Sequence, residues 1–279
     1  MRDKSVEAHE VLVLERVGDP SVPGDLPATT ASAATHDVPA DISLRLLVDG
    51  APLVTLLCLN RGCEELALGF LFTEGFIDSL ESVRTVVFHE ELYTVEVELD
   101  QPLDQALLAR TRSMTSGCGR GITYVDPRVD ELFRPVGHTV LLEAGSLWER
   151  IAAFNRSSAL YREVGGVHSC QFDGSQGAVL SEDIGRHNCV DRIAGVLLRR
   201  QAERGGSGPP GAGGQILSSG RVSTEILTKC VRLGVEVVIS RSAPTASALR
   251  LAADFGLTVI GYARGGRAVL YAGAERLRL

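Results

Sequence analysis

The chain has 279 residues, of which 44% are hydrophobic, 23% charged and 5% aromatic, and its formal net charge is -7 at pH 7. This composition is typical of a soluble globular protein and excludes a disordered or fibrous chain, and the length suffices for one large domain or two modest domains. The acidic balance and the few aromatic residues disfavour nucleic acid as a partner, because phosphates and bases bind basic and aromatic surfaces.

The amino-terminal residues carry no sign of a targeting signal. The first twenty residues mix acids and bases without a long apolar stretch, and no apolar run elsewhere reaches the length that spans a membrane. Residues 17–40 are rich in Pro, Ala, Ser, Thr and Asp and lack apolar periodicity. Such a segment buries too little apolar surface to offset the entropy of ordering, so we expect residues 1–40 to be flexible.

Residues 41–145 predict a smaller, β-rich N-terminal subdomain. Two apolar runs flank the turn dipeptide Asp49-Gly50, which is typical of a β-hairpin. The stretch GCEELALGFLFTEGFI has apolar residues at helical spacing, and Gly75 is placed to end a short buried helix. Residues 83–99 then alternate as strands do.

The segment MTSGCGRGI (114–122) holds Cys118 between two glycines and has neither helical nor strand periodicity. We expect an exposed loop, in which Arg120 and backbone amides favour the thiolate, the nucleophilic form of Cys118. Thiol chemistry is one interpretation. The other is a tight turn in which the cysteine is incidental.

Residues 146–279 predict an α/β domain. Ser146 and Glu149 have the spacing of a capping box at the start of a helix. Beyond it, short apolar strands alternate with amphipathic helices to the end of the chain. This alternation is typical of a mixed, largely parallel sheet with helices on both faces.

Four polar junctions follow strands in this domain, and ligands of such sheets bind beyond the carboxyl ends of the strands. The junctions are SEDIGRHNC (181–189), SSGRVSTE (218–225), SRSAPT (240–245) and YARGGR (262–267). Three of these junctions stand at the start of a predicted helix and supply Arg186, Arg221 and Arg241. The last junction brings two arginines around a Gly-Gly pair. Helix N-termini and arginines bind phosphate, so the pattern predicts a pyrophosphate-bearing ligand, with ordinary polar helix caps as the alternative.

The remaining cysteines and histidines are ranked by their local pattern. Cys58 and Cys230 lie in apolar patterns and are expected to pack in the core, whereas Cys63 stays ambiguous. Scattered thiols in a long chain favour a reducing, cytoplasmic location. Two H-x-C pairs could supply the four ligands of a zinc site only if they face each other, and nothing in the sequence shows that they do. We instead expect three side chains to have polar roles near the ligand or buried structural roles. The pairs are His168 with Cys170 and His187 with Cys189, and the three side chains are His168, His187 and Asp191.

Taken together, the motifs resemble the formate dehydrogenase accessory sulfurtransferase (FdhD-like) family. They cover the chain from about residue 42 to its end, in the family's order. The matching pieces are LALGFLFTEGFI (66–77), SGCG (116–119), GGVHS (165–169), EDIGRHN-VD (182–191), SGR-S-E (219–225), SRSAPT (240–245) and GYARGGR (261–267).

The resemblance implies a function. Such proteins accept sulfur from a cysteine desulfurase as a persulfide on the loop cysteine, here Cys118, and pass it to the bis(molybdopterin guanine dinucleotide) molybdenum cofactor of formate dehydrogenase. It also implies a homodimer and a cytidine-deaminase-like C-terminal part. The residues expected to bind the cofactor are Tyr262, Ala263, Arg264, Gly265, Gly266 and Arg267, together with His187, Arg221 and Arg241 of the junctions.

The chain departs from the family at one position of the loop. Many members have C-x-x-C there, and Gly121 stands where the second cysteine would be. Release of sulfur then relies on another thiol, a reductant or direct transfer. Cys170 or Cys189 is a substitute thiol if it lies near Cys118.

Two other functions compete with sulfur transfer. A zinc-dependent deaminase needs H-x-E together with P-C-x-x-C, and the sequence lacks this combination. A non-catalytic molybdenum cofactor chaperone for formate dehydrogenase would bind the cofactor without carrying sulfur. Alkylation of Cys118 separates the carrier, which would fail, from the chaperone, which would still work.

Overall fold

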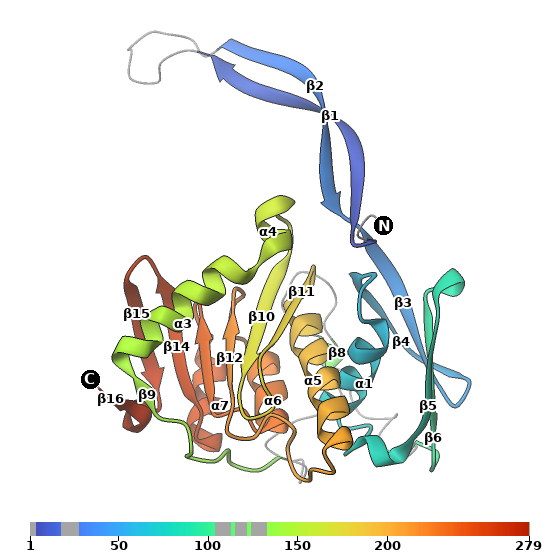
Figure 1. Ribbon diagram of the computed structural model, residues 1–279, viewed down its shortest axis with the longest axis vertical. Helices are drawn as coiled ribbons and strands as arrows, with labels where there is room; N and C mark the ends of the chain where they lie inside the picture. The colour runs from blue at the N-terminus through green and yellow to red at the C-terminus, as the bar shows by residue number, and fades with distance from the viewer. Residues whose placement is uncertain (1–3, 18–27, 104–112, 115–121, 124–132, 279) are drawn as a thin grey trace.

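A computed structural model describes residues 4–17, 28–103, 113–114, 122–123 and 133–278 (Figure 1). The chain folds into an α/β body with one long hairpin that projects from it (Figure 1). No helix within these ranges is long and apolar enough to cross a membrane.

The projecting hairpin pairs β1 (Val6–Val17) with β2 (Ala28–Pro39) in an antiparallel ladder. Here the structure differs from the predicted flexible segment. The composition gave no sign of this hairpin, because a two-stranded ladder pairs backbone groups and needs no buried side-chain face. Leu12 and Leu14 are exposed, so the hairpin buries little apolar surface.

A four-stranded sheet forms most of the N-terminal subdomain, with strand order β4-β3-β6-β5. The predicted hairpin around Asp49-Gly50 is confirmed as β3 (Asp41–Val48) and β4 (Ala51–Leu59), and both turn residues have positive φ. The stretch 83–99 forms β5 (Val83–His89) and β6 (Thr94–Leu99), separated by a single 3-10 turn.

The predicted short helix is α1 (Cys63–Thr73), which is buried along almost its whole length. It ends where Gly75, with a φ of 77°, donates its N–H to the Phe72 carbonyl oxygen at 3.0 Å. Helix α1 packs against α5 (Arg186–Glu203), and one hydrophobic core contains residues of both predicted subdomains.

The C-terminal part is built on a six-stranded sheet with the order β11-β10-β12-β13-β14-β15. The predicted mixed sheet is confirmed, but it is not largely parallel, because within this sheet only β12–β13 and β13–β14 pair in parallel. The difference arises because β10, a polar strand that the sequence pattern did not reveal, enters antiparallel between β11 and β12. The strands are β10 (His168–Asp173), β11 (Val179–Asp183), β12 (Gln215–Ser218), β13 (Val237–Ser240), β14 (Thr258–Arg264) and β15 (Arg267–Ala272).

Helices cover both faces of this sheet, as predicted. Ile216 of β12 joins the core shared with α5, α6 (Thr224–Leu233) and α7 (Ala246–Phe255), while the next residue, Leu217, joins the core under α3 (Ala144–Ser157). This alternation is the period of two that a buried strand requires. A short α4 (Ala159–Glu163) follows α3. The cytidine-deaminase-like architecture stays a prediction.

Helix α3 begins two residues earlier than the capping-box pattern indicated. The Ser146 hydroxyl donates to the Glu143 carbonyl oxygen at 3.1 Å instead of capping a backbone N–H. A short parallel pair precedes this helix, formed by β9 (Leu142–Glu143) and β16 (Leu277–Arg278). The pair ties residues on the N-terminal side of the predicted domain boundary to the end of the chain.

A buried ion-pair network joins α1, α5 and α6. The Lys229 ammonium lies 2.7 Å from a Glu74 carboxylate oxygen and 2.8 Å from Asp191 Oδ1, and Thr73 donates to the same Asp191 oxygen at 2.6 Å. Burial opposes the charge on Lys229, but the two carboxylates outweigh burial and raise its pKa. Asp191 therefore has a structural role in the core.

Candidate functional site

The four polar junctions lie at one edge of the six-stranded sheet. Strands β11, β12, β13 and β14 run in the same direction, because β10 is antiparallel to both β11 and β12 while β12, β13 and β14 are parallel. Their carboxyl ends therefore meet at one edge (Figure 1). The placement expected from the sequence is confirmed.

Hydrogen bonds join three of these junctions into one surface. The Ser240 hydroxyl donates to the Gly220 carbonyl oxygen at 2.6 Å, and the Arg241 N–H donates to the Ser218 carbonyl oxygen at 3.0 Å. The Tyr262 N–H reaches the Ser242 carbonyl oxygen at 3.1 Å. The loops after β12, β13 and β14 are thus fixed relative to one another.

Two helices start at this edge without a side-chain cap. The residue before α5 is Gly185, which has no side chain, and the residue before α6 is Ser223, whose hydroxyl accepts no backbone hydrogen bond. Within the described part of the chain, the buried Ser223 hydroxyl and His187 Nε2 have no hydrogen-bond partner. Free N–H groups, the positive dipole end and unpaired buried polar atoms together favour an anionic ligand.

The predicted stretch 262–267 forms the turn from β14 to β15. Gly265 and Gly266 have φ values of 58° and 73°, which a side chain would strain. The Arg264 guanidinium lies 6.0 Å from the centre of the Tyr262 ring, and both side chains are exposed together with Arg267. This turn presents two cations and an aromatic ring to solvent.

The other predicted cofactor residues differ in how they face this edge. Arg221 is exposed and Arg241 half-buried, and neither side chain is hydrogen-bonded or ion-paired to any residue that the structure describes. Ala263 is buried under α3, so only its backbone is available to a ligand.

Both candidate histidines lie at the same edge. His168 Nδ1 is 3.4 Å from the Ser219 hydroxyl, and His187 lies in the first turn of α5. Burial, followed by the charge of Arg186, lowers the pKa of both rings, and the pKa of His187 falls to about 3. The rings are therefore neutral at neutral pH.

The two carboxylates of the EDIGRHN motif hold the fold together. Asp183 is fully buried and accepts hydrogen bonds from the Leu59 N–H at 3.2 Å, Asn188 Nδ2 at 2.7 Å and Arg192 Nη2 at 2.7 Å. Glu182 accepts from the Ser158 hydroxyl at 2.5 Å. Sequence reasoning missed Arg192, although a lone arginine within the apolar stripe of a helix signals a buried partner.

The five cysteines that the structure describes are all buried. Cys118 lies outside the described residues. Cys170 and Cys189 are fully buried, and their thiols donate to the Ser218 hydroxyl and the His168 carbonyl oxygen, each at 3.4 Å. The neighbouring Cys189 thiol lowers the pKa of Cys170, while burial raises the pKa of Cys189. The cysteines of the two H-x-C pairs thus lie close together, but no group of three or more metal-ligating residues occurs in the described part of the chain.

A second pair of thiols, Cys58 and Cys63, lies near the start of α1. Cys58 is fully buried, as is Cys230 in α6, which confirms the packing role expected for Cys58 and Cys230. A hydrogen bond from Cys58 lowers the pKa of Cys63, whose side chain is buried as well. The ambiguous thiol thus belongs to a buried pair.

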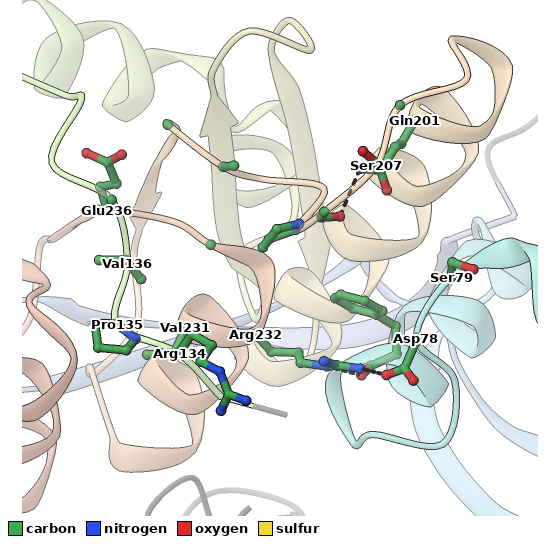
Figure 2. A pocket seen from close by; sticks show the side chains of 18 of the residues that line it. Asp78, Ser79, Arg134, Pro135, Val136, Gln201, Ser207, Val231, Arg232 and Glu236 are labelled. Carbon is green, nitrogen blue, oxygen red and sulfur yellow. Dashed lines mark hydrogen bonds and ion pairs between the residues drawn. The ribbon is translucent and has the colours of Figure 1, made fainter. Parts of the chain in front are cut away.

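A cavity lies away from this edge. It has a volume of about 870 Å³ and lies near the amino ends of β12 and β13, where Gly213 and Glu236 line it (Figure 2). Arg232 crosses one wall, ion-paired with Asp78 and stacked 4.7 Å from the Phe72 ring centre. The predicted phosphate-binding residues are not among those that line it.

Comparisons with known proteins agree with the motifs. The family model described as FdhD/NarQ family matches residues 39–278. The chain is 30% identical over 257 residues to the sulfur carrier protein FdhD of Staphylococcus haemolyticus, covering 91% of this chain and 93% of that protein. It is 31% identical over 241 residues to the sulfur carrier protein FdhD of Shouchella clausii, covering 84% and 87%.

A crystal structure supports the fold. It is of a protein from Desulfotalea psychrophila assigned as a formate dehydrogenase accessory protein, and it aligns with a TM-score of 0.70 and 21% identity over 96% of this chain and 99% of that one. With the family model matching most of the sequence, the chain belongs to the FdhD/NarQ family.

Proposed function

We propose that this protein is a sulfurtransferase that accepts sulfur from a cysteine desulfurase as a persulfide on Cys118. It then transfers the sulfur to the bis(molybdopterin guanine dinucleotide) molybdenum cofactor of formate dehydrogenase. The observation that carries the proposal is the single sheet edge where four polar junctions meet two uncapped helix N-termini. The names of the relatives, sulfur carrier proteins, support the carrier step.

The carrier step needs no outside oxidant or reductant. The Cys118 thiolate attacks the terminal sulfur of the desulfurase persulfide, so a new S–S bond forms on Cys118 and the desulfurase cysteine leaves as a thiolate. Release of that sulfur as sulfide takes up two electrons. A second thiol supplies them by forming a disulfide with Cys118, and because Gly121 replaces the second loop cysteine, that thiol comes from outside the loop.

The cofactor is a substrate that carries two pyrophosphates, and the sheet edge offers the groups that bind them. Arg221, Arg241, Arg264 and Arg267 supply guanidinium forks, and the starts of α5 and α6 supply free N–H groups. The exposed Tyr262 ring provides a stacking surface. We further propose a homodimer that works in the cytoplasm and docks on the formate dehydrogenase catalytic subunit.

The deciding experiment measures the intact mass after incubation with a cysteine desulfurase and cysteine. Wild type is expected to gain one sulfur atom that dithiothreitol removes, and Cys118→Ala is expected to gain none. A Cys170→Ala, Cys189→Ala double variant serves as the control that keeps the loop thiol. If wild type gains nothing, or Cys118→Ala gains as much, a non-catalytic cofactor chaperone replaces the carrier.

A further inference from the structure

The hairpin of β1 and β2 leaves both of its outer edges unpaired. It forms a two-stranded sheet of its own, and no other strand in the described ranges pairs with it. Its base is anchored, because the Ala40 N–H donates to the Ser5 carbonyl oxygen at 2.8 Å and Val6 packs against the small core that contains Val167. Beyond this base the two strands project away from the body (Figure 1). A two-stranded hairpin alone is only marginally stable in water, and an open edge is a template for another strand.

The antiparallel ladder determines which residues of β2 turn their backbone outward. The hydrogen-bonded pair of Ser5 and Ala40 continues in the same register into β1 and β2. Hydrogen-bonded and non-hydrogen-bonded pairs alternate along such a ladder. The outer edge of β2 therefore presents the free N–H and C=O groups of every second residue, namely Thr29, Ala31, Ala33 and Thr35.

The charges of the two strands differ. Strand β2 has no charged residue from Thr29 to Thr35, whereas β1 carries Glu7, Glu10 and Glu15. Charged side chains on an edge strand oppose pairing with a further strand, and two copies of β1 side by side would bring like charges together. Two copies of β2 bring together only alanine, serine and threonine. The hairpin thus has one edge that is complementary to itself, and such an edge closes a twofold dimer instead of extending into a fibre.

We propose that β2 pairs antiparallel with β2 of a second copy of this chain, around a twofold axis at Ser32. The result is a four-stranded sheet with the order β1-β2-β2-β1, in which Ala31 lies opposite the partner's Ala33. Leu12 and Leu14 are 70% and 68% exposed and share a face with Ala33 and Ala31, the residues opposite them in the hairpin. Rows of leucine and alanine then cross all four strands, so each row gains apolar neighbours from the second copy.

This interface holds the two bodies apart. Seven residues separate Ser32 from Pro39 at the base, so each arm spans ~24 Å at about 3.4 Å per residue, and the two bases lie ~48 Å apart. The polar junctions of both copies stay open to ligands at this separation. The interface specifies the homodimer of the proposed function, whereas sulfur transfer by Cys118 does not depend on it.

Analytical ultracentrifugation of the full-length protein tests the interface with two proline variants. Ala31→Pro removes an outward N–H of β2 and Ala8→Pro removes one of β1, while both keep the hydrogen bonds within the hairpin. We expect the wild type and Ala8→Pro to dimerise equally, and the dissociation constant of Ala31→Pro to rise about tenfold or more. Small-angle X-ray scattering of the wild type is expected to show two separated bodies instead of one compact particle.

A crosslink tests the register even where a proline disturbs the hairpin. Ser32 lies opposite the partner's Ser32 in a non-hydrogen-bonded pair, with the Cα atoms about 4.5 Å apart, a spacing that a disulfide spans. In a Cys118→Ala background the five other cysteines are buried, so diamide is expected to oxidise two copies of Ser32→Cys to one disulfide that dithiothreitol reduces. Glu10→Cys on the outer strand is the control and is expected to give no crosslink.

The proposal is overturned if the wild type is a monomer, which would leave the β2 edge to a strand of another protein. It is equally overturned if Ala31→Pro dimerises as tightly as the wild type, since the homodimer then uses another surface. A Ser32→Cys variant that crosslinks no more than Glu10→Cys also overturns it. The mass gained by Cys118 in Ala31→Pro is expected to match the wild type, so failure of this interface and failure of sulfur transfer are told apart.

Discussion

Gly69 of α1 and Gly195 of α5 bring their two helices into backbone contact. A Cβ atom on Gly69 would lie 2.8 Å from the Gly195 nitrogen and only 1.6 Å from the Asp191 carbonyl oxygen. A Cβ atom on Gly195 would lie 2.0 Å from the Glu65 carbonyl oxygen. This close approach is what allows the short Asp191 side chain of α5 to share the Lys229 ammonium with Glu74 at the end of α1.

Gly69→Ala is expected to lower the free energy of unfolding by about 3 kcal/mol or more, since the new methyl group meets backbone that cannot move away. Gly145→Ala is the matched control, because Gly145 is also helical and its Cβ would meet nothing within 4 Å. That control is expected to stabilise by up to about 1 kcal/mol. Urea unfolding of both variants measures the difference, and equal stabilities would contradict the helix contact.

Lys229→Met is expected to destabilise the protein by about 3–5 kcal/mol, because it leaves the Asp191 and Glu74 carboxylates buried without their cation. The folded-state pKa of Lys229 is raised above its unfolded value. Its contribution is therefore complete below an unfolded pKa of about 10.5 and is lost as pH rises through the folded pKa.

Lys4→Met is the control for this variant, since Lys4 is the chain's other lysine and its pair with Glu90 is exposed. Urea titrations at pH 7 are expected to show no change for Lys4→Met and a large loss for Lys229→Met. A loss of similar size in both variants would mean that removal of a charge, rather than the buried network, sets the stability.

The half-buried His187 predicts a loss of stability in acid. Its pKa is about 3 in the folded protein, below the value of about 6.5 of an unfolded chain, so the unfolded state binds more protons between these values. Stability is thus complete above pH 6.5 and falls toward pH 3, by up to about 1.4 kcal/mol for each pH unit. His168, whose pKa is also lowered, adds to the fall.

Urea unfolding between pH 7.5 and 4.5 checks this linkage. His187→Gln is expected to flatten the pH dependence of the free energy of unfolding. The variant lacks the ring that binds a proton in the unfolded state but not in the folded state. His36→Gln alters an exposed ring on the projecting hairpin and is expected to keep the wild-type slope. An unchanged slope in His187→Gln would show that its ring is charged in the folded protein.

Local signals predicted the fold where one turn or one face determines the structure. Asp49 and Gly50 both adopt positive φ, so the turn dipeptide alone located the hairpin of β3 and β4. Strand β10 was missed because its sequence, HSCQFD, is largely polar, and its antiparallel pairing depends on neighbours distant in the chain. The hairpin of β1 and β2 was missed because its stability comes from backbone pairing.

The candidate site was predictable to the extent that it depends on strand ends. The arginines and glycines of the four junctions meet at one edge because strand direction alone fixes where carboxyl ends lie. The roles of Asp183 and Asp191 were not predictable in this way. Their partners, Arg192 and Lys229, are set by how α1, α5 and α6 pack, which no local pattern encodes.

The sheet edge predicts where a guanine nucleotide binds. Guanosine diphosphate carries the guanine and a diphosphate of the proposed cofactor, so it is expected to bind at the arginines that surround the edge. Arg264→Gln and Arg241→Gln each remove one guanidinium fork and are expected to weaken binding about tenfold in calorimetric titrations. Higher salt is expected to weaken the wild type more than either variant, since fewer charge contacts remain to be screened in the variants.

Arg134→Gln separates this edge from the large cavity, because Arg134 is an exposed arginine that lines the cavity. If the edge binds the nucleotide, Arg134→Gln keeps wild-type affinity while the two edge variants lose it. The opposite pattern would move the nucleotide to the cavity near the amino ends of β12 and β13. The starts of α5 and α6 would then have no part in cofactor binding, and the shared direction of the four strands would serve the fold alone.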